Sequence, residues 1–320
     1  MQEFCLYIVV PCYNEEEVIL MTHETLGRVL NELKLKEKIS GSSSICYVDD
    51  GSLDNTWNII SQLAKDYPNV KGVRLSSNCG HQNALLAGMK FSRKYADAVV
   101  TIDADLQDDV SVINEMVEKY RSGVKVVYGV RKGRQSDSFL KRWTAQAFYK
   151  FMGFMKVKTV YNHADFRLID KKVLIELENY KEVNLFLRGI FPLMGFRSDC
   201  VYYERKERTA GITKYPFSKM FSFAWEGITS FSVFPLRIVL FLGIIVFLLS
   251  LGLIIWAVES VISARVLPGW ASIVIPASFF AGIQMISIGF IGEYVGKIYS
   301  EVKSRPRFII EETVGTGDQN

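Results

Sequence analysis

Residues Leu6–Glu16 read LYIVVPCYNEE, an apolar run that ends abruptly in polar residues. The run is rich in β-branched and aromatic side chains, which favour a strand. The apolar spacing of a helix follows at Glu16–Leu35. A buried strand followed directly by a helix is the repeating unit of a parallel α/β sheet. This stretch therefore predicts the fold class.

The same alternation continues along the chain. Further strands are predicted at Ser44–Val48, Val70–Leu75, Ala98–Ile102 and Lys125–Tyr128, and helices at Asn55–Asp66, Gln82–Tyr95 and Ser111–Arg121. Strands joined by helices predict a mainly parallel α/β sheet with right-handed crossovers and helices on its faces. Because such sheets bind ligands at the carboxyl ends of their strands, the residues after each strand are the candidates for function.

Length and composition exclude several protein classes. With 320 residues, 49% of them hydrophobic and 22% charged, the chain can bury a large core and is neither disordered nor a small disulfide scaffold. The net charge of +4 is too small to indicate a nucleic-acid partner. The five cysteines include no C-x-x-C pair, which argues against a disulfide framework and a zinc site. The N-terminal residues, MQEFCLYIVV, lack the features of a signal peptide.

Two long uncharged stretches lie in the last third of the chain. Ile238–Val258 and Val266–Gly292 contain 21 and 27 residues and no charged side chain. A helix of the first length rises about 31 Å, close to the thickness of a bilayer core. We therefore expect a soluble domain at 1–230, two transmembrane helices within 235–298 (about 236–259 and 267–294) and a tail at 299–320, with Thr313–Asn320 frayed. The alternative is a helical hairpin buried in a soluble core.

Basic residues indicate which side of the membrane the domain occupies. Arg237 precedes the first apolar stretch, and Lys297, Lys303, Arg305 and Arg307 follow the second. The short link between the stretches holds only Arg265, offset by Glu259. Basic residues favour the cytoplasmic side, so we expect a multi-pass protein of the bacterial inner membrane whose catalytic domain and both termini are cytoplasmic.

A basic, aromatic-rich segment precedes the membrane region. Between Arg131 and Lys158 there are eight basic residues and one acid, Asp137. Helical patterns at about 135–156 and 215–234 combine these charges with Phe, Tyr and Met. We expect amphipathic helices that lie on the surface of an anionic leaflet. Solvated basic helices, or helices of an ordinary core, are the alternatives.

Polar side chains follow three of the predicted strands. The first strand leads into Pro11-Cys12-Tyr13-Asn14-Glu15, the second into Asp49-Asp50-Gly51-Ser52, and the fourth into Asp103-Ala104-Asp105-Leu106-Gln107-Asp108. Carboxylate and amide oxygens are the ligands of Mg²⁺ or Mn²⁺, which commonly take one or two carboxylates plus substrate phosphates. A lone D-x-D pattern is weak, whereas three polar strand ends that meet in one cleft predict a nucleotide and metal site.

The order of these motifs resembles glycosyltransferase family 2, whose members have the GT-A fold, a Rossmann-like, mainly parallel sheet with flanking helices. The matching motifs are P-C-Y-N-E-E, V-D-D-G-S-x-D-N-T, N-x-G-x-Q-N-A and D-A-D-L-Q-D-D. Asn162–Leu168, Arg208–Tyr215 and the C-terminal apolar pair are similar to the polyprenyl-phosphate subgroup, which includes dolichyl-phosphate mannose synthase and bacterial undecaprenyl-phosphate glucosyltransferases of O-antigen glucosylation. Ile212 departs from the serine that relatives often carry there.

The resemblance implies roles for the residues on the donor side. The nucleotide sugar is expected to contact Pro11, Tyr13, Glu15, Asp49, Asp50, Gln82, Asp103, Ala104 and Asp105. Asp49 or Asp50 would accept hydrogen bonds from the base or ribose. Asp105 and Gln107 would ligate a divalent cofactor, Mg²⁺ or Mn²⁺, and Asp103 would touch ribose or metal. Asp103 and Asp105 are therefore expected, with Asp165, to be the catalytic residues.

Cations are expected where the substrates bring their phosphates together. Arg131, Arg134, Arg167 and Lys214 are the candidates for binding the acceptor phosphate or the diphosphate. The resemblance makes Asp165 the candidate base. A phosphate monoester has a second pKa of about 6 and hardly needs deprotonation, so we expect Asp165 to orient the acceptor or Arg167. The D-F-R spacing places both on one face of a strand.

The sequence as a whole predicts an inverting, metal-dependent hexosyltransferase. It would transfer a sugar, with UDP-glucose as the favoured donor, to undecaprenyl phosphate, and the anchored relatives imply a homo-oligomer. Alternative donors are GDP-mannose, UDP-GlcNAc and a formylated aminoarabinose nucleotide. A processive synthase is disfavoured because the chain has no Q-x-x-R-W signature. The alternative from another class is a membrane scaffold that binds nucleotide without turnover.

Overall fold

The computed structural model describes residues 3–132, 163–182, 186–204, 234–263 and 269–315. The chain divides into two compact units, Met1–Pro216 with Pro306–Asn320, and Phe217–Arg305. The expected interfacial helices at about 135–156 and 215–234 lie outside the described residues, apart from Phe234. Arg134 and Lys214 lie outside them as well.

The first unit is built on one mixed sheet. Its strands are β1 (Leu6–Cys12), β2 (Ser44–Asp49), β3 (Val70–Leu75), β4 (Ala98–Thr101), β5 (Val126–Arg131), β6 (His163–Asp170), β7 (Ser198–Tyr203) and β8 (Ile310–Val314). The described strands are ordered β7-β5-β6-β4-β1-β2-β3-β8. The central β4-β1-β2-β3 part is parallel, whereas β6 and β8 run antiparallel to their neighbours. The α/β fold with a mainly parallel centre is confirmed.

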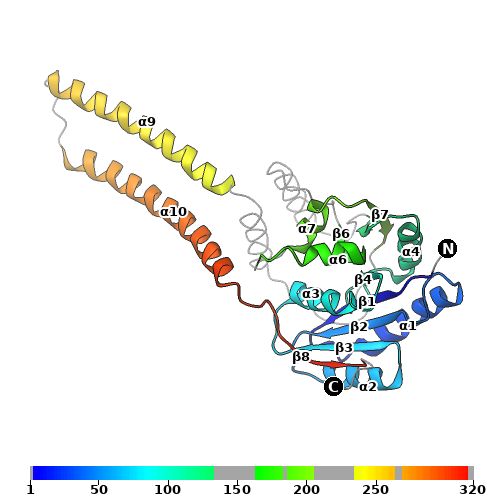
Figure 1. The fold of residues 1–320 in the computed structure, drawn as a ribbon. Helices are drawn as coiled ribbons and strands as arrows, with labels where there is room; N and C mark the ends of the chain where they lie inside the picture. The colour runs from blue at the N-terminus through cyan, green and yellow to red at the C-terminus, as the bar shows by residue number, and fades with distance from the viewer. Residues whose placement is uncertain (1–2, 133–162, 183–185, 205–233, 264–268, 316–320) are drawn as a thin grey trace. The chain divides into compact units, whose positions relative to one another are not determined.

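Helices cover both faces of this sheet (Figure 1). They are α1 (Ile19–Leu35), α2 (Thr56–Asp66), α3 (His81–Ser92), α4 (Ile113–Arg121), α6 (Lys171–Leu177) and α7 (Leu187–Leu193), with a 3₁₀ turn, η1, at Val110–Val112. Every residue of β1 is buried because it is covered on both sides. Leu6, Ile8 and Val10 share a hydrophobic cluster with residues of α1, α2 and α4. Burial of each such side chain contributes about 1.5–3 kcal/mol.

The opposite face of β1 packs closely against α3. A Cβ atom added at Gly88 would lie 2.4 Å from Val9 Cγ1 and 2.7 Å from Val48 Cγ2. A side chain at this position would therefore push α3 away from the sheet. Because α3 begins at His81, this close packing also determines where the start of the helix lies relative to the ends of β1 and β2.

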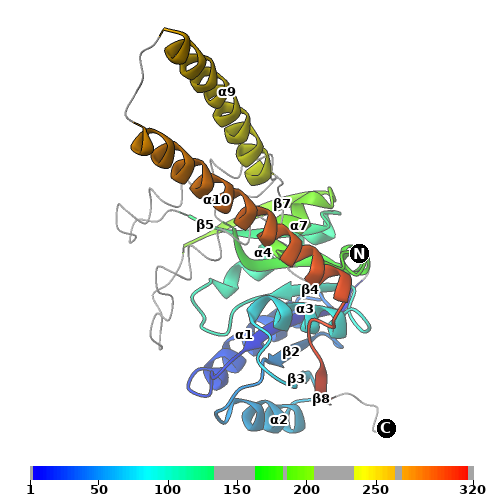
Figure 2. The same cartoon turned by 90° about the vertical axis from the view of Figure 1, so that its left-hand side faces the viewer.

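The C-terminal strand corrects the expectation of a frayed end at Thr313–Asn320. Thr313 and Val314 belong to β8, which pairs with β3 (Figures 1 and 2). Trp57 Nε1 donates a hydrogen bond to Glu312 Oε2 at 3.1 Å, and Arg307 Nη2 donates to the carbonyl of Tyr180 at 2.7 Å. The pattern of a single short edge strand is too weak to predict, since long-range pairing rather than local sequence stabilises it.

The second unit contains two long helices, α9 (Phe234–Ile262) and α10 (Trp270–Lys303). Helices were predicted at about 236–259 and 267–294, and α10 continues nine residues beyond the second range because Glu293–Lys303 remains helical. Pro276 lies inside α10. Within the described residues, one segment, Phe279–Lys303, is long and apolar enough to cross a membrane.

Candidate functional site

The polar strand ends meet at one edge of the sheet. Cys12 pairs with Asp49 at the ends of β1 and β2, and Val9 pairs with Thr101 of β4. Since β6 is antiparallel to β4, with Thr101 opposite Arg167, β6 begins at the edge where β4 ends. The loops that carry Tyr13 and Asp103 therefore lie at the same edge as Asp165 near the start of β6, as the sequence predicts for strand ends of an α/β sheet.

The loops after β1 and β2 are joined by hydrogen bonds between side chains and backbone. Asn14 N donates to Ser52 Oγ at 3.0 Å, and Leu53 N donates to Asn14 Oδ1 at 2.9 Å. Glu15 N donates to Thr56 Oγ1 at 2.9 Å. Pro11 is buried in β1, whereas the ring of Tyr13 is exposed. These bonds hold the Tyr13–Glu15 segment against the end of β2, with Tyr13 directed to solvent.

Asp49 and Asp50 are neighbours with different environments. Both Asp50 carboxylate oxygens accept backbone N–H groups, from Cys79 at 2.8 Å and Gly80 at 2.9 Å. Asp49 Oδ1 accepts from Ser52 N at 3.2 Å, while its buried Oδ2 makes no hydrogen bond in the described part of the chain but lies 3.7 Å from Arg74 Nε in an ion pair. Burial raises the pKa of both carboxyl groups. Asp49 is thus paired with a cation of β3, and Asp50 attaches the loop before α3.

The close approach of these two loops depends on Gly51. Its φ is +67°, and an added Cβ would lie 2.6 Å from the backbone carbon of Ser77. A residue with a side chain would therefore be strained and would separate Asp50 from the amides that it binds.

The acidic loop after β4 is also held in place by a hydrogen bond from helix α1. Thr22 Oγ1 of α1 donates to the carbonyl of Ala104 at 2.7 Å. Within the loop, Leu106 has a φ of +52°, and Gln107 N donates to Asp105 Oδ1 at 3.2 Å. The left-handed conformation of Leu106 turns the chain, and this turn brings the backbone N–H of Gln107 to the carboxylate of Asp105.

The donor atoms of this loop fit a divalent cation that also binds phosphates. In the described ranges, no cluster of three or more His, Cys, Asp or Glu residues could hold a metal by itself. Asp103 Oδ1 is buried and makes no hydrogen bond within those ranges. Two carboxylates plus the Gln107 amide are the type of oxygen donors to which Mg²⁺ or Mn²⁺ would add substrate phosphates and water.

A second cluster of charges surrounds Asp165 at the start of β6. Arg167 Nη2 donates to Asp165 Oδ1, as the D-F-R spacing predicts. Arg188 of α7 donates from Nη2 to Asp165 Oδ2 at 2.7 Å and from Nε to Oδ1 at 3.3 Å. Burial alone would raise the pKa of Asp165, but Arg188 and Arg167 lower it well below its usual range. Asp165 is therefore a stable anion and a poor proton acceptor.

His81 lies between the two acidic groups. Its Nε2 atom is 3.4 Å from Asp103 Oδ1 and 3.9 Å from Asp165 Oδ2. The neighbouring Gln82 accepts a hydrogen bond at Oε1 from Leu187 N at 3.0 Å. The start of α3 thus contacts the acidic loop, the start of β6 and the start of α7.

Arg131, expected to bind a phosphate, pairs with an acid of the D-A-D-L-Q-D-D motif. Arg131 Nη2 donates to Asp108 Oδ1 at 2.9 Å, and Tyr203 OH donates to the same oxygen at 2.7 Å. Burial alone would lower the pKa of Arg131, but Asp108 and Tyr203 raise it. This pairing holds the end of β5 against the acidic loop.

Sequence reasoning missed the contributions of His81 and Arg188. His81 belongs to a motif that was recognised, but its position between two carboxylates depends on how three strands are arranged. Arg188 lies in Phe186-Leu187-Arg188-Gly189, where a single cation at the start of a short apolar helix carries no periodic or spacing signal. Only the contact with Asp165 identifies it.

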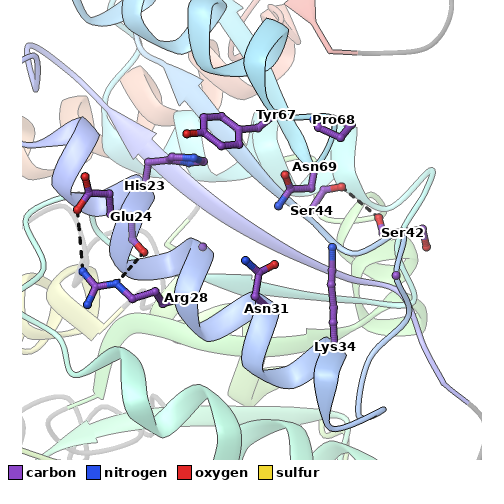
Figure 3. Close-up of a pocket in the computed structure, with 12 residues that line it drawn as sticks. His23, Glu24, Arg28, Asn31, Lys34, Ser42, Ser44, Tyr67, Pro68 and Asn69 are labelled. Carbon is purple, nitrogen blue, oxygen red and sulfur yellow. Dashed lines mark hydrogen bonds and ion pairs between the residues drawn. The ribbon is translucent and has the colours of Figure 1, made fainter.

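A separate pocket lies at the opposite edge of the sheet (Figure 3). It has a volume of about 830 Å³, and its lining includes Ser44 at the start of β2 and Pro68 and Asn69 just before β3. The rings of His23 and Tyr67 are 4.6 Å apart on its wall. Because these residues lie at the amino ends of the strands, the pocket is distinct from the acidic loops.

Comparison with known proteins gives consistent matches. The sequence profile described as Glycosyl transferase family 2 matches residues 7–178. The chain is 50% identical over 306 residues to glycosyltransferase YkoT of Bacillus subtilis, covering 96% of this chain and 91% of that protein. It is 39% identical over 308 residues to the SfII prophage-derived bactoprenol glucosyl transferase of Shigella flexneri, covering 96% and 97%.

Among solved structures, the chain is similar to glucosyl-3-phosphoglycerate synthase from Mycobacterium tuberculosis in complex with Mn²⁺, UDP-glucose and phosphoglyceric acid. The TM-score is 0.46 and the identity 15%, and the match covers 71% of this chain and 78% of that chain.

Proposed function

The chain belongs to glycosyl transferase family 2, and on that premise we propose that it transfers glucose from UDP-glucose to a polyprenyl phosphate such as undecaprenyl phosphate. The bactoprenol glucosyl transferase of Shigella flexneri, similar along almost the whole of both chains, supports a lipid carrier as the acceptor. The product would be a lipid-linked sugar for glycosylation of the cell envelope.

The observation that carries this proposal is the separation of two sites by His81. Asp103, 3.4 Å from His81 on one side, begins the loop suited to a cation and a diphosphate. Asp165, 3.9 Å from His81 on the other side, holds two guanidinium groups suited to a second phosphate. An in-line displacement needs the leaving and attacking phosphates on opposite faces of the sugar, so this arrangement supports a single inverting step.

Residues of the donor side would bind the nucleotide sugar. Asp49 Oδ2, which lies 3.7 Å from Arg74 Nε, would accept from the base or ribose, and Tyr13 after the neighbouring strand offers an exposed ring. Asp103, Asp105 and Gln107 would hold Mg²⁺ or Mn²⁺ together with the diphosphate. The ion, when bound, would neutralise charge that develops on the leaving nucleoside diphosphate.

Asp165 would position the acceptor side without removing a proton. The acceptor phosphate is largely dianionic near neutral pH, since its second pKa is about 6. The lowered pKa of Asp165 makes this residue unsuited to accept a proton there. Rate enhancement would then arise from orientation and charge neutralisation.

We propose that the chain lies in the bacterial inner membrane, and two observations support a membrane location. Apolar side chains on both long helices are exposed, for example Phe241 at 64% on α9 and Met285 at 71% on α10, which fits lipid surroundings better than a buried soluble hairpin. In addition, β8 follows α10 and yet belongs to the same sheet as β1–β7. A pair of crossings by α9 and α10 would return the chain to the side of the sheet, which supports the hairpin that we propose; the cytoplasmic side is our expectation from the basic residues at the helix ends.

A donor panel tests the proposal. The purified full chain would receive undecaprenyl phosphate, Mg²⁺ or Mn²⁺, and one of UDP-glucose, UDP-GlcNAc, UDP-galactose or GDP-mannose, with nucleoside diphosphate release and lipid-linked sugar both measured. We expect UDP-glucose to give the highest kcat/KM, and expect chelation of the metal or Asp105→Asn to lower the rate at least about 100-fold. A preference for another donor would overturn the sugar assignment, and nucleotide binding without transfer would favour a scaffold.

A further inference from the structure

The cluster around Asp165 brings two arginine side chains to one carboxylate. One carboxylate binds two guanidinium groups, those of Arg167 and Arg188. Arg167 is 1% exposed, and its Nε and Nη1 atoms are buried without a hydrogen-bond partner in the described residues. Buried N–H donors without acceptors are costly. Two guanidinium groups close to each other are favourable surroundings for an anion.

Arg188 is the member of the cluster that such an anion can reach. Its side chain is 35% exposed, whereas that of Arg167 is 1% exposed and stacks on Phe191, with 5.0 Å between the guanidinium carbon and the ring centre. Arg167 therefore lies behind Asp165, and Arg188 lies toward solvent. A planar guanidinium can bind a carboxylate on one edge and a phosphate on another, because it has five N–H donors.

The position of Arg188 is determined from the donor side of the site. Its neighbour Leu187 donates its backbone N–H to Gln82 Oε1 at 3.0 Å, and Gln82 follows His81 in α3. His81 in turn lies between Asp103 and Asp165. Arg188 is thus held on the Asp165 side of His81, across from the loop suited to the metal and the leaving diphosphate.

We propose that Arg188 binds the phosphate of the lipid acceptor, with Asp165 and Arg167 as positioning residues behind it; this inference rests on the proposed function. Arg188 lies beyond residues 7–178, which the family profile matches. The phosphate would displace the diphosphate at the anomeric carbon: the new bond forms from a phosphate oxygen, the bond to the diphosphate breaks, and the diphosphate leaves with its electron pair.

The test compares Arg188→Gln and Arg188→Lys in the full chain, with Arg93→Gln as the matched control. Arg93 also forms an ion pair with a carboxylate at 2.7 Å, that of Glu178, but follows the end of α3 that is far from His81. Three quantities are measured: KM and kcat for undecaprenyl phosphate at saturating UDP-glucose, Kd for UDP with Mn²⁺ by calorimetry, and the melting temperature.

We expect Arg188→Gln to raise KM for undecaprenyl phosphate at least tenfold, and to leave Kd for UDP within twofold. Arg188→Lys should recover part of the lost affinity for undecaprenyl phosphate, because lysine keeps the positive charge but lacks the paired N–H donors of a guanidinium. Arg93→Gln should behave as wild type. A parallel loss of UDP affinity would assign Arg188 to the donor diphosphate and overturn the inference. An unchanged KM, or a lower melting temperature that Arg188→Lys does not restore, would show that Arg188 has only a structural role in its ion pair with Asp165, and would overturn the inference. Failure of the wild-type chain to use any lipid phosphate would instead refute the proposed function.

Discussion

The two sides of the site, which we propose bind the sugar donor and the lipid acceptor, are held together by different interactions. On the donor side, side chains bind backbone N–H groups: Asp50 binds those of Cys79 and Gly80, and Asn14 binds that of Leu53. On the acceptor side, charged side chains bind each other, as Arg167 and Arg188 bind Asp165. The donor loops are therefore preformed by chain geometry, whereas the acceptor side depends on a balance of buried charges. Single substitutions should affect the two sides differently.

The largest effect is expected for Asp165→Asn. It removes the carboxylate that two guanidinium groups bind, one of them fully buried, and breaking a buried pair costs about 3–5 kcal/mol. Denaturation of the detergent-solubilised chain should show a loss of this size, with transfer strongly reduced. Asp66→Asn, an exposed substitution on α2, should stay within about 0.5 kcal/mol of wild type.

The same variant gives a pH test. Because the pKa of Asp165 is lowered in the folded state, its stabilising contribution is fully present above the unfolded pKa of about 3.9 and is lost as pH falls below it. The difference in stability between wild type and Asp165→Asn should stay constant from about pH 8 to 5 and shrink below about pH 4. A difference that shrinks near neutral pH would show that the guanidinium groups do not hold Asp165 as an anion.

Effects of intermediate size, different for each residue, are expected for substitutions of the two neighbouring acids of the donor side, Asp49 and Asp50. Asp50→Ala removes the acceptor of two backbone amides, so we expect a loss of about 1–3 kcal/mol in stability together with weaker UDP binding. Asp49→Asn should instead raise Kd for UDP about tenfold, or 1.4 kcal/mol, with the melting temperature little changed. Calorimetry and thermal denaturation of both variants check this. Equal changes in UDP affinity and in melting temperature for the two variants would contradict the assignment of ligand binding to Asp49 and of loop attachment to Asp50.

The smallest effect is expected at the strand that follows the membrane helices. Glu312→Ala removes the acceptor of Trp57 Nε1 and should lower the free energy of unfolding by about 1 kcal/mol. Transfer should remain close to wild type, because this contact lies at the outer edge of the sheet. Glu17→Ala, another exposed acid, is the control. A large loss of UDP binding would mean that β8 supports the donor loops more directly than its contacts indicate.

Much of the donor side could be predicted because its signals are local. Each strand is an apolar run followed at once by its polar residues, so the amino-acid sequence alone places Asp49, Asp103 and Asp105 at one edge of the sheet. The division of labour between Asp49 and Asp50 could not be predicted, because it depends on which carboxylate faces the amides of a loop 29 and 30 residues away.

The acceptor side was predicted in part. The contact of Asp165 with Arg167 follows from alternation along a strand, which is a local rule. The burial of Arg167 does not follow from it, because burial depends on Phe191 and on the strands packed beside β6.

The amino-acid sequence by itself determined the alternation of strands and helices, the apolar stretches near the C-terminus and the acids at the strand ends, because periodicity and composition act over a few residues. Only the tertiary structure decided that Arg188 reaches Asp165, that His81 lies between two carboxylates and that the last strand returns to the sheet. Contacts between residues far apart in the chain depend on how the packed elements meet, and no local pattern records that.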